Sequence, residues 1–258
     1  MKKVLFILPA LSLGGLERVQ VTIANALAKK GYDVTVMALD PACDLVPQLD
    51  KRVHYVHKPY KAHKIMQRIP YIRHKYYDDG MWETRASAKT LYKYYVGNER
   101  YDVEIAFFRG LPIKIISGSA NKDAVHLAWV HNDFRLASGY SNNFKSLKSV
   151  KEAYESYDKV ICVSKQAEEG FKKTVGDTNN TEVIYNMSPV AEIKERAECL
   201  PRINVNKSSF HMVLVARLLD SAKGQKRLIS VVSKLHNEGK DVSLALIGGG
   251  ADEQMLKN

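Results

Sequence analysis

The order of apolar runs in the first forty residues constrains the fold of this chain more than any other feature. An apolar run at Lys3–Leu8 is followed by two glycines at 14 and 15. Leu16–Lys30 then carries apolar residues at spacings of three and four, which lie on one face of a helix. Gly31 is placed to end this helix, and Asp33–Leu39 is a second strand-like run. Strand, helix and strand in this order are typical of a parallel βαβ unit.

The same alternation continues to about residue 185. Helices are predicted at Leu147–Tyr157 and at Lys165–Val175, the second with Ser164 as its N-cap. Further strands are predicted at Val53–His57, Val103–Phe108, Ala124–Val130, Lys159–Val163 and Glu182–Tyr185. We therefore predict an α/β fold in which residues 1–185 form a Rossmann-like domain with a doubly wound parallel sheet.

A second domain is indicated after a change in composition. Residues 186–206 contain two prolines and no sustained period, so they are predicted to be a linker. The alternation restarts with a strand at Phe210–Ala216, a helix at Lys226–Glu238 and a strand at Val242–Ile247. Residues 207–258 are thus expected to begin a second Rossmann-like domain. It is expected to be incomplete, because two parallel strands cannot be covered on both faces by one helix.

Positive charge is concentrated in residues 51–100, which contain 12 Lys and Arg and 4 Asp and Glu. This stretch has a net charge of +8, and the whole chain has a net charge of +11. Together with paired tyrosines, this composition suits an anionic membrane surface, and a solvated face of the domain is the alternative. No zinc-finger or RNP-type spacing accompanies the charge, so a nucleic-acid partner is not expected.

No apolar run approaches the roughly 18 residues of a membrane span, and three scattered cysteines predict neither disulfides nor a metal site. We expect a cytoplasmic protein, free or peripheral at the inner face of the cell membrane.

Loops that follow parallel strands are where ligands of such folds bind. Four places there carry residues suited to a ligand: the pair Gly14 and Gly15, His131, Arg217 with Lys223, and the glycines 248–250. The glycine pair lets a ligand approach a helix N-terminus, and an imidazole can bond a hydroxyl group. Arg and Lys suit a diphosphate. A structural role is the alternative for each, and a turn is favoured for 248–250.

Taken together, these segments resemble the family-4 glycosyltransferases. The resemblance rests on residues 13–19 (LGGLERV), 129–133 (WVHND), 163–165 (VSK) and 183–186 (VIYN), and on 215–218 (VARL), 223–224 (KG) and 246–250 (LIGGG). They occur in the family's order along nearly the whole chain, with 51–100 the least similar part.

The resemblance implies a GT-B fold with two Rossmann-like domains and a retaining hexosyl transfer. The donor would be a nucleotide diphosphate sugar, UDP- or GDP-linked, and the acceptor a glycan or lipid-linked molecule of envelope polysaccharide or glycolipid synthesis, with no cofactor and no obligatory metal. Arg217 and Lys223 would neutralise the leaving diphosphate, and His131 would contact the transferred sugar. The remaining contacts to donor or acceptor are expected from Gly14, Gly15, Glu17, Gly248 and Gly249.

One departure from the family concerns the donor site. Family members carry a later Glu-x7-Glu segment that binds the donor, and this sequence reaches Asn258 before any such segment. We therefore expect a truncated enzyme, with a non-catalytic remnant that binds an acceptor or a membrane as the alternative. A nicotinamide-dependent oxidoreductase is a third interpretation. Asp40 suits it, but residues 12–16 do not form the GxGxxG that it needs.

Overall fold

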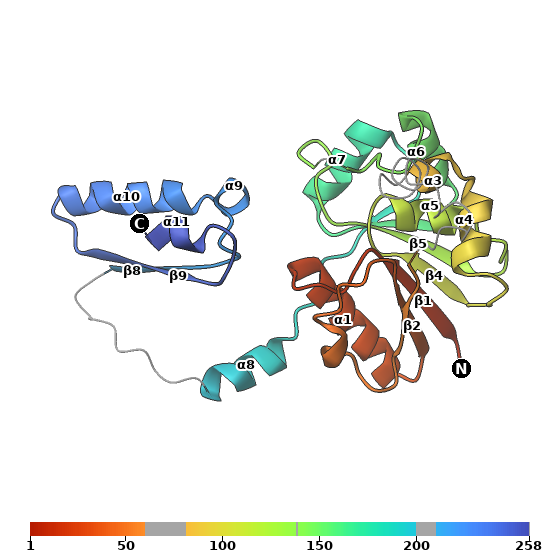
Figure 1. The fold of residues 1–258 in the computed structure, drawn as a ribbon, viewed down its shortest axis with the longest axis horizontal. Coiled ribbons are helices and arrows are strands. Elements are labelled where there is room, and N and C mark those ends of the chain that lie inside the picture. The colour runs from red at the N-terminus through yellow and green to blue at the C-terminus, as the bar shows by residue number, and fades with distance from the viewer. Residues whose placement is uncertain (60–80, 138, 200–209, 258) are drawn as a thin grey trace, which may run out of the picture. The chain divides into compact units, whose positions relative to one another are not determined.

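The protein consists of two units in the computed structural model, which describes residues 1–59, 81–137, 139–199 and 210–257 (Figure 1). The first unit spans Met1–Val190 and the second Ala191–Asn258. The stretch predicted to be a linker contains a helix, α8 (Val190–Cys199), and its residues 200–206 lie outside the described part.

The first unit is built on one sheet of seven strands, in the order β3-β2-β1-β4-β5-β6-β7, and every pair is parallel. The strands are β1 (Lys3–Leu8), β2 (Asp33–Ala38), β3 (His54–His57), β4 (Val103–Ala106), β5 (Val125–Val130), β6 (Lys159–Cys162) and β7 (Thr181–Val183). The chain runs outward from β1 to β3 and then returns to add β4 on the other side of β1. This confirms the predicted α/β fold and places a switch point between β1 and β4.

Both faces of the sheet are buried, which explains why its first strand is a continuous apolar run. Leu5 and Ile7 point into one core, and Val4, Phe6 and Leu8 into the other. All five side chains are at most 2% exposed. Side chains alternate along a strand, so an uninterrupted apolar run requires cover on both sides.

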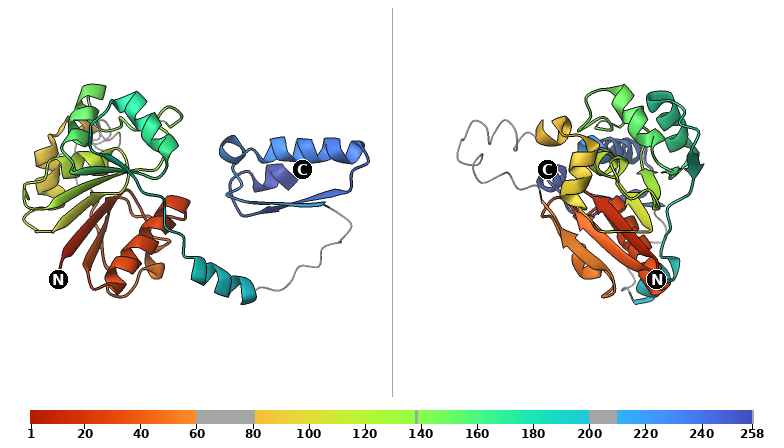
Figure 2. Two further views of the ribbon diagram at one scale, coloured as in Figure 1. Left: turned by 180° about the vertical axis from the view of Figure 1, so that it is seen from behind. Right: turned by 90° about the vertical axis from the view of Figure 1, so that its right-hand side faces the viewer.

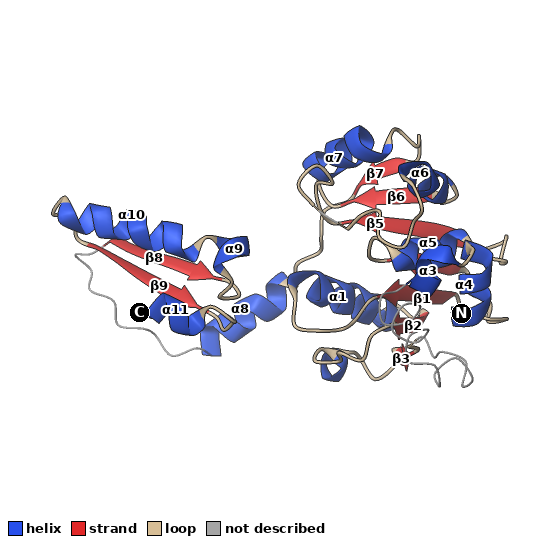
Figure 3. Cartoon of the chain, turned by 45° about the horizontal axis from the view of Figure 1, so that its top comes forward, coloured by secondary structure: helices blue, strands red, loops and turns tan. Residues whose placement is uncertain are grey.

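The helices supply that cover. α1 (Gly15–Lys29) packs on the face of Val4 and Phe6. The other face is covered by α4 (Ala88–Tyr95), α5 (Leu111–Ser117), α6 (Leu147–Glu155) and α7 (Lys165–Val175) (Figure 3). Two short elements, η1 (Val46–Gln48) and α3 (Met81–Arg85), complete the described part of this unit.

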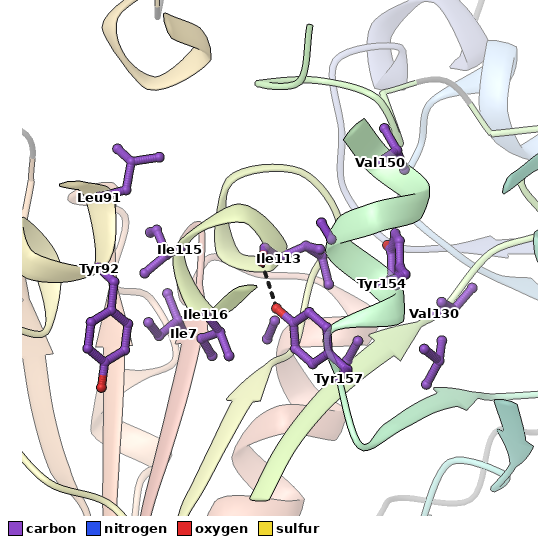
Figure 4. Packing of buried hydrophobic residues seen from close by; sticks show 14 of the residues in the cluster. Ile7, Leu91, Tyr92, Ile113, Ile115, Ile116, Val130, Val150, Tyr154 and Tyr157 are labelled. Atoms are coloured by element: carbon purple, nitrogen blue, oxygen red, sulfur yellow. Dashed lines mark hydrogen bonds between the residues drawn. The ribbon is translucent and has the colours of Figure 1, made fainter. Parts of the chain in front are cut away.

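Aromatic side chains fill the larger core, where they interlock α5 and α6 (Figure 4). Tyr154 is fully buried, and the hydroxyl of Tyr157 donates to the Ile113 carbonyl at 2.7 Å. Two predicted helix signals are confirmed at the ends of helices. The Ser164 hydroxyl accepts from the Ala167 N–H at 3.1 Å, and Gly31 follows α1 with a φ of +86°.

The second unit holds a pair of parallel strands, β8 (Phe210–Val215) and β9 (Val242–Ile247). The helices α9 (Asp220–Lys223), α10 (Gln225–Asn237) and α11 (Glu253–Lys257) accompany them. α10 lies along one face of the strands (Figure 2). Val213 and Val215 point away from that face and are 60% and 72% exposed. Only one face of this small sheet is covered by the described residues.

Candidate functional site

A pocket of about 600 Å³ lies at the switch point of the larger sheet. Its wall includes residues from the loops that follow four strands: Pro9 after β1, Asp40 after β2, Arg109 after β4 and Asn132 after β5. Leu16 of α1 and the loop 139–143 complete it. The carboxyl ends of strands on either side of a switch point leave such a crevice, which is the usual ligand site of this fold.

The glycine pair forms the start of α1 beside this pocket. Gly14 is the N-cap, with no side chain bonded to the free N–H groups of the first turn. At Gly15 no atom lies within 4 Å of the position that a Cβ would take, so a ligand can approach the backbone. The Glu17 carboxylate folds back against Gly14, where the helix N-terminus favours its charge. An anionic ligand would therefore compete with the Glu17 carboxylate for the helix N-terminus, whereas a ligand hydroxyl group could donate a hydrogen bond to that carboxylate.

His131 follows β5 directly, and its ring is packed at 4.6 Å from that of Phe107. Nε2 lies 2.8 Å from the Phe107 carbonyl. Because a carbonyl only accepts, Nε2 carries the proton, and the lone pair of the neutral ring is at Nδ1. Nδ1 is buried and has no hydrogen-bond partner among the described residues. Nδ1 is therefore an unused acceptor next to the pocket residue Asn132, and it is closed off from solvent in this structure.

The charge state of His131 fits that role. Burial lowers the pKa of its imidazole to about 4, and the nearby positive charge of Arg109 acts in the same direction. The hydrogen bond to Phe107 opposes this shift only in part. The ring is thus neutral at neutral pH and acts as an acceptor at Nδ1.

Arg109 is a pocket residue that the sequence interpretation missed. Its Nη1 donates to the Asn132 side-chain oxygen at 2.8 Å, and both residues line the pocket. The available signal was its place just after the predicted strand Val103–Phe108, the same signal that identified His131. Asp40, noted only for the oxidoreductase interpretation, lines the pocket as well.

Lys114 holds two neighbouring segments together beneath the pocket. It lies on α5 and is only 8% exposed. Its ammonium donates to the carbonyls of Glu83 at 2.6 Å, Thr84 at 2.8 Å and Asn143 at 2.8 Å. Burial and the charge of Lys145 lower the pKa of this ammonium to about 8. Lys114 thereby fixes the loop 139–143, which forms a wall of the pocket.

Arg217 and Lys223 belong to the second unit. Arg217 follows β8, Lys223 ends α9, and both are exposed. The Gln225 amide donates to the Arg217 carbonyl at 2.7 Å and so fixes this loop. In the described part of the chain neither cation forms an ion pair. Their charges are therefore available to an anionic ligand.

The glycines 248–250 have a packing role at two positions. A Cβ on Gly248 would overlap the Ala216 carbonyl, and one on Gly250 would overlap the Leu218 carbonyl. The Leu218 N–H donates to the Gly249 carbonyl at 3.0 Å, which joins the loops after β8 and β9. These contacts fit the turn favoured from the sequence. Gly249 has no neighbour within 4 Å of a Cβ, so its backbone is accessible.

The remaining sequence interpretations concern metals and membranes. Across residues 1–59, 81–137, 139–199 and 210–257, no cluster of three potential metal ligands occurs. No helix in that part of the chain has the length and apolar character to cross a bilayer. Within the basic stretch 51–100, residues 60–80 lie outside the described part.

Comparison with known sequences gives one family. The profile of Glycosyltransferase Family 4 matches residues 13–189. An uncharacterized glycosyltransferase of Haemophilus influenzae is 27% identical over 264 residues, which cover 100% of this chain and 65% of that relative. The chain thus spans slightly less than two thirds of the relative's length.

Solved structures share the fold. The complex of Anabaena Alr3699/HepE with UDP and glucose has a TM-score of 0.60 at 17% identity, covering 100% of this chain and 64% of that one. A variant of S. aureus TarM, in complex with Fondaparinux, alpha-GlcNAc-glycerol and UDP, has a TM-score of 0.65 at 12% identity, covering 100% and 74%. These likenesses confirm the predicted GT-B type of fold.

Proposed function

Because the chain belongs to glycosyltransferase family 4, we propose that it takes part in the retaining transfer of a hexose from a nucleotide diphosphate sugar. The acceptor is a glycan or a lipid-linked molecule, in envelope polysaccharide or glycolipid synthesis. The observation that carries the proposal is the switch-point pocket beside a neutral His131, within a segment that matches the family.

The two units contribute different chemistry in this proposal. Arg217 and Lys223 neutralise the charge that develops on the leaving diphosphate, which stabilises the transition state. The lone pair of His131 Nδ1 accepts a hydrogen bond from a hydroxyl group of the transferred sugar. The backbone N–H groups after Gly14 and Gly15 contact the donor at the start of α1.

UDP-linked sugars are the first donors to test, because the Anabaena Alr3699/HepE and S. aureus TarM complexes described above both contain UDP. GDP-linked sugars are the second class. The test measures transfer and slow donor hydrolysis by the full-length native protein, for the wild type and for Arg217→Ala and Lys223→Ala. Lys240→Ala, which removes an exposed cation elsewhere in the second unit, is the matched control.

We expect each of the two site variants to lower kcat roughly 100-fold, as loss of one preorganised charge contact does in other enzymes. Lys240→Ala should keep the wild-type rate. Unchanged kinetics in both site variants would refute the diphosphate assignment. A native protein without transfer or hydrolysis for either donor class would support the alternative, a non-catalytic remnant that binds an acceptor or a membrane.

The basic composition of residues 51–100 supports a peripheral position at the inner face of the cell membrane. This stretch has a net charge of +8, from 12 cations and 4 anions, and each cation near anionic headgroups contributes about 1 kcal/mol. Binding to vesicles with anionic lipid should therefore weaken steeply as salt rises. Lack of binding at low salt would exclude this part of the proposal.

A further inference from the structure

The Arg109 guanidinium is a half-buried cation that pairs with no carboxylate among the residues that the structure describes. It lines the switch-point pocket, where its Nη1 donates a hydrogen bond to the Asn132 side-chain oxygen. In the described part of the chain it forms no ion pair, although Asp40 lines the same pocket. A guanidinium has five N–H donors, and partial burial of its charge is costly when no anion faces it.

The bond to Asn132 fixes the orientation of this guanidinium. It engages one N–H and leaves the edge that carries the other donors for a ligand. A carboxylate or a phosphate matches two parallel N–H groups of arginine in a bidentate contact. The positive charge of Arg109 also influences His131, because it contributes to the lowered pKa of that imidazole.

The rest of the pocket is suited to a sugar. The amide-bearing residues Asn142 and Asn143 line the pocket, and Phe108 adds an apolar side chain to the lining. Gly110 has a φ of +80° and precedes α5 directly. A Cβ at this position would lie 3.5 Å from the Asn143 side-chain oxygen, so the start of α5 is close to Asn143. Lys114 fixes this wall through the Asn143 carbonyl. The pocket thus combines one oriented cation with amide groups, apolar groups and the carboxylate of Asp40.

We propose that Arg109 makes the pocket selective for an acceptor that carries a carboxylate or a phosphate, such as a uronic acid or a sugar phosphate unit. The proposal rests on the function proposed above and specifies the acceptor class of the same enzyme. The donor diphosphate is a second anion, but its charge is assigned to Arg217 and Lys223. Arg109 is therefore free to bind the anionic group of the acceptor.

The test measures binding rather than turnover. The full-length native protein is titrated with glucuronate, glucose 6-phosphate, glucose and UDP, and affinities are read from ligand-observed NMR. Arg109→Gln removes the charge but keeps a hydrogen-bonding side chain. The matched control is Arg52→Gln, which also removes one arginine but at an exposed ion pair with Asp50, outside the pocket.

We expect the wild type to bind at least one anionic sugar roughly tenfold more tightly than glucose, since a charge-assisted bidentate contact is worth about that factor. Arg109→Gln should bind glucose as before and lose the preference, and Arg52→Gln should keep it. Arg109→Lys should retain part of it.

Three results would overturn the proposal. They are equal affinity of the wild type for glucose and both anionic sugars, a preference that persists in Arg109→Gln, and absence of binding by any sugar probe. Loss of UDP binding in Arg109→Gln, with sugar binding unchanged, would assign Arg109 to the donor and overturn it as well. An inactive protein that still shows the Arg109-dependent preference would instead contradict the proposed transfer alone.

Discussion

Replacement of Lys114 by methionine tests whether the buried ammonium holds the pocket wall in place. Methionine keeps most of the side-chain volume and removes the three hydrogen bonds to the carbonyls of Glu83, Thr84 and Asn143. The change therefore tests the hydrogen bonds of the ammonium separately from the packing of the side chain on α5. We expect a clear loss of stability in the first unit and exposure of the loop 139–143.

The size of the loss follows from the contacts. A buried acceptor left without its donor costs about 1–3 kcal/mol, which gives about 3–9 kcal/mol for three carbonyls. Two terms reduce this sum: the buried cation no longer has to be desolvated, and the Thr84 and Asn143 bonds are only partly buried, so water can replace them. We therefore expect a loss of about 3 kcal/mol, a large share of the roughly 5–15 kcal/mol that stabilises a domain.

Tryptophan fluorescence during denaturant unfolding is the suitable assay. The sequence contains two tryptophans, Trp82 and Trp129, and both lie in the first unit. The signal therefore reports on that unit by itself. Lys93→Met is the control, because Lys93 is an exposed lysine on the neighbouring helix α4. A Lys114→Met variant within about 0.5 kcal/mol of the wild type, as expected for surface changes, would refute the reasoning.

Three further predictions concern other parts of the chain. His131 keeps a folded pKa of about 4 because it is buried, below its ordinary value of 6.5, so the unfolded state binds the proton more tightly. Stability should fall as the pH drops from 6.5 toward 4, by about 2 kcal/mol between pH 7 and 5, and His131→Gln should remove this component in fluorescence unfolding curves. An equal pH dependence in the variant would contradict the assignment. Ser164→Ala should cost about 1 kcal/mol in the same assay, through loss of the N-cap of α7, and an unchanged midpoint would argue against the cap. Gly248→Ala should weaken hydrogen-exchange protection of β8 and β9, because its φ is +149° and a Cβ would overlap the Ala216 carbonyl. Gly249→Ala, at a position with room for a Cβ, should leave that protection intact.

Local patterns were sufficient for much of the fold. The ends of α7 and of β9 lie where the sequence predicts them, because a cap or a glycine marks each boundary. α5 was missed for a physical reason. Its segment Leu111–Ser117 is short, contains a proline and has Lys114 and Ser117 as its only polar residues, so it has no clear polar face. It is helical because it is buried between neighbours, and at Gly118 the backbone of Ala88 lies too close for any side chain.

The candidate site was predictable where it depends on one strand end. The glycine pair and His131 were found in this way, and Arg109 carries the same signal. Lys114 was not predictable, because a lysine on a helix is ordinarily a surface residue. Its three acceptors lie 29 to 31 residues away along the chain, and only the topology of the unit brings them to it.

Buried polar contacts in the core were equally hidden from the sequence. Glu104 of β4 is fully buried, although its neighbours in the strand suggest a purely apolar element. It accepts a hydrogen bond at 2.7 Å from the Tyr92 hydroxyl of α4. Its second oxygen lies 3.4 Å from His126 Nε2 on β5. This carboxylate thus has one neighbour from α4 and one from β5, and no local pattern in the sequence indicates such a set.

The central position of β1 has a consequence for synthesis on the ribosome. β1 is made before the other six strands of its sheet, and one of its edges can pair with β2 as soon as residue 38 has emerged. Its other edge must wait for β4, which begins at Val103. Throughout that interval a strand of sequence KVLFIL presents unpaired backbone groups, a template for pairing with other nascent chains. Slow translation between residues 39 and 103 should therefore prolong this exposure and increase the need for chaperone protection.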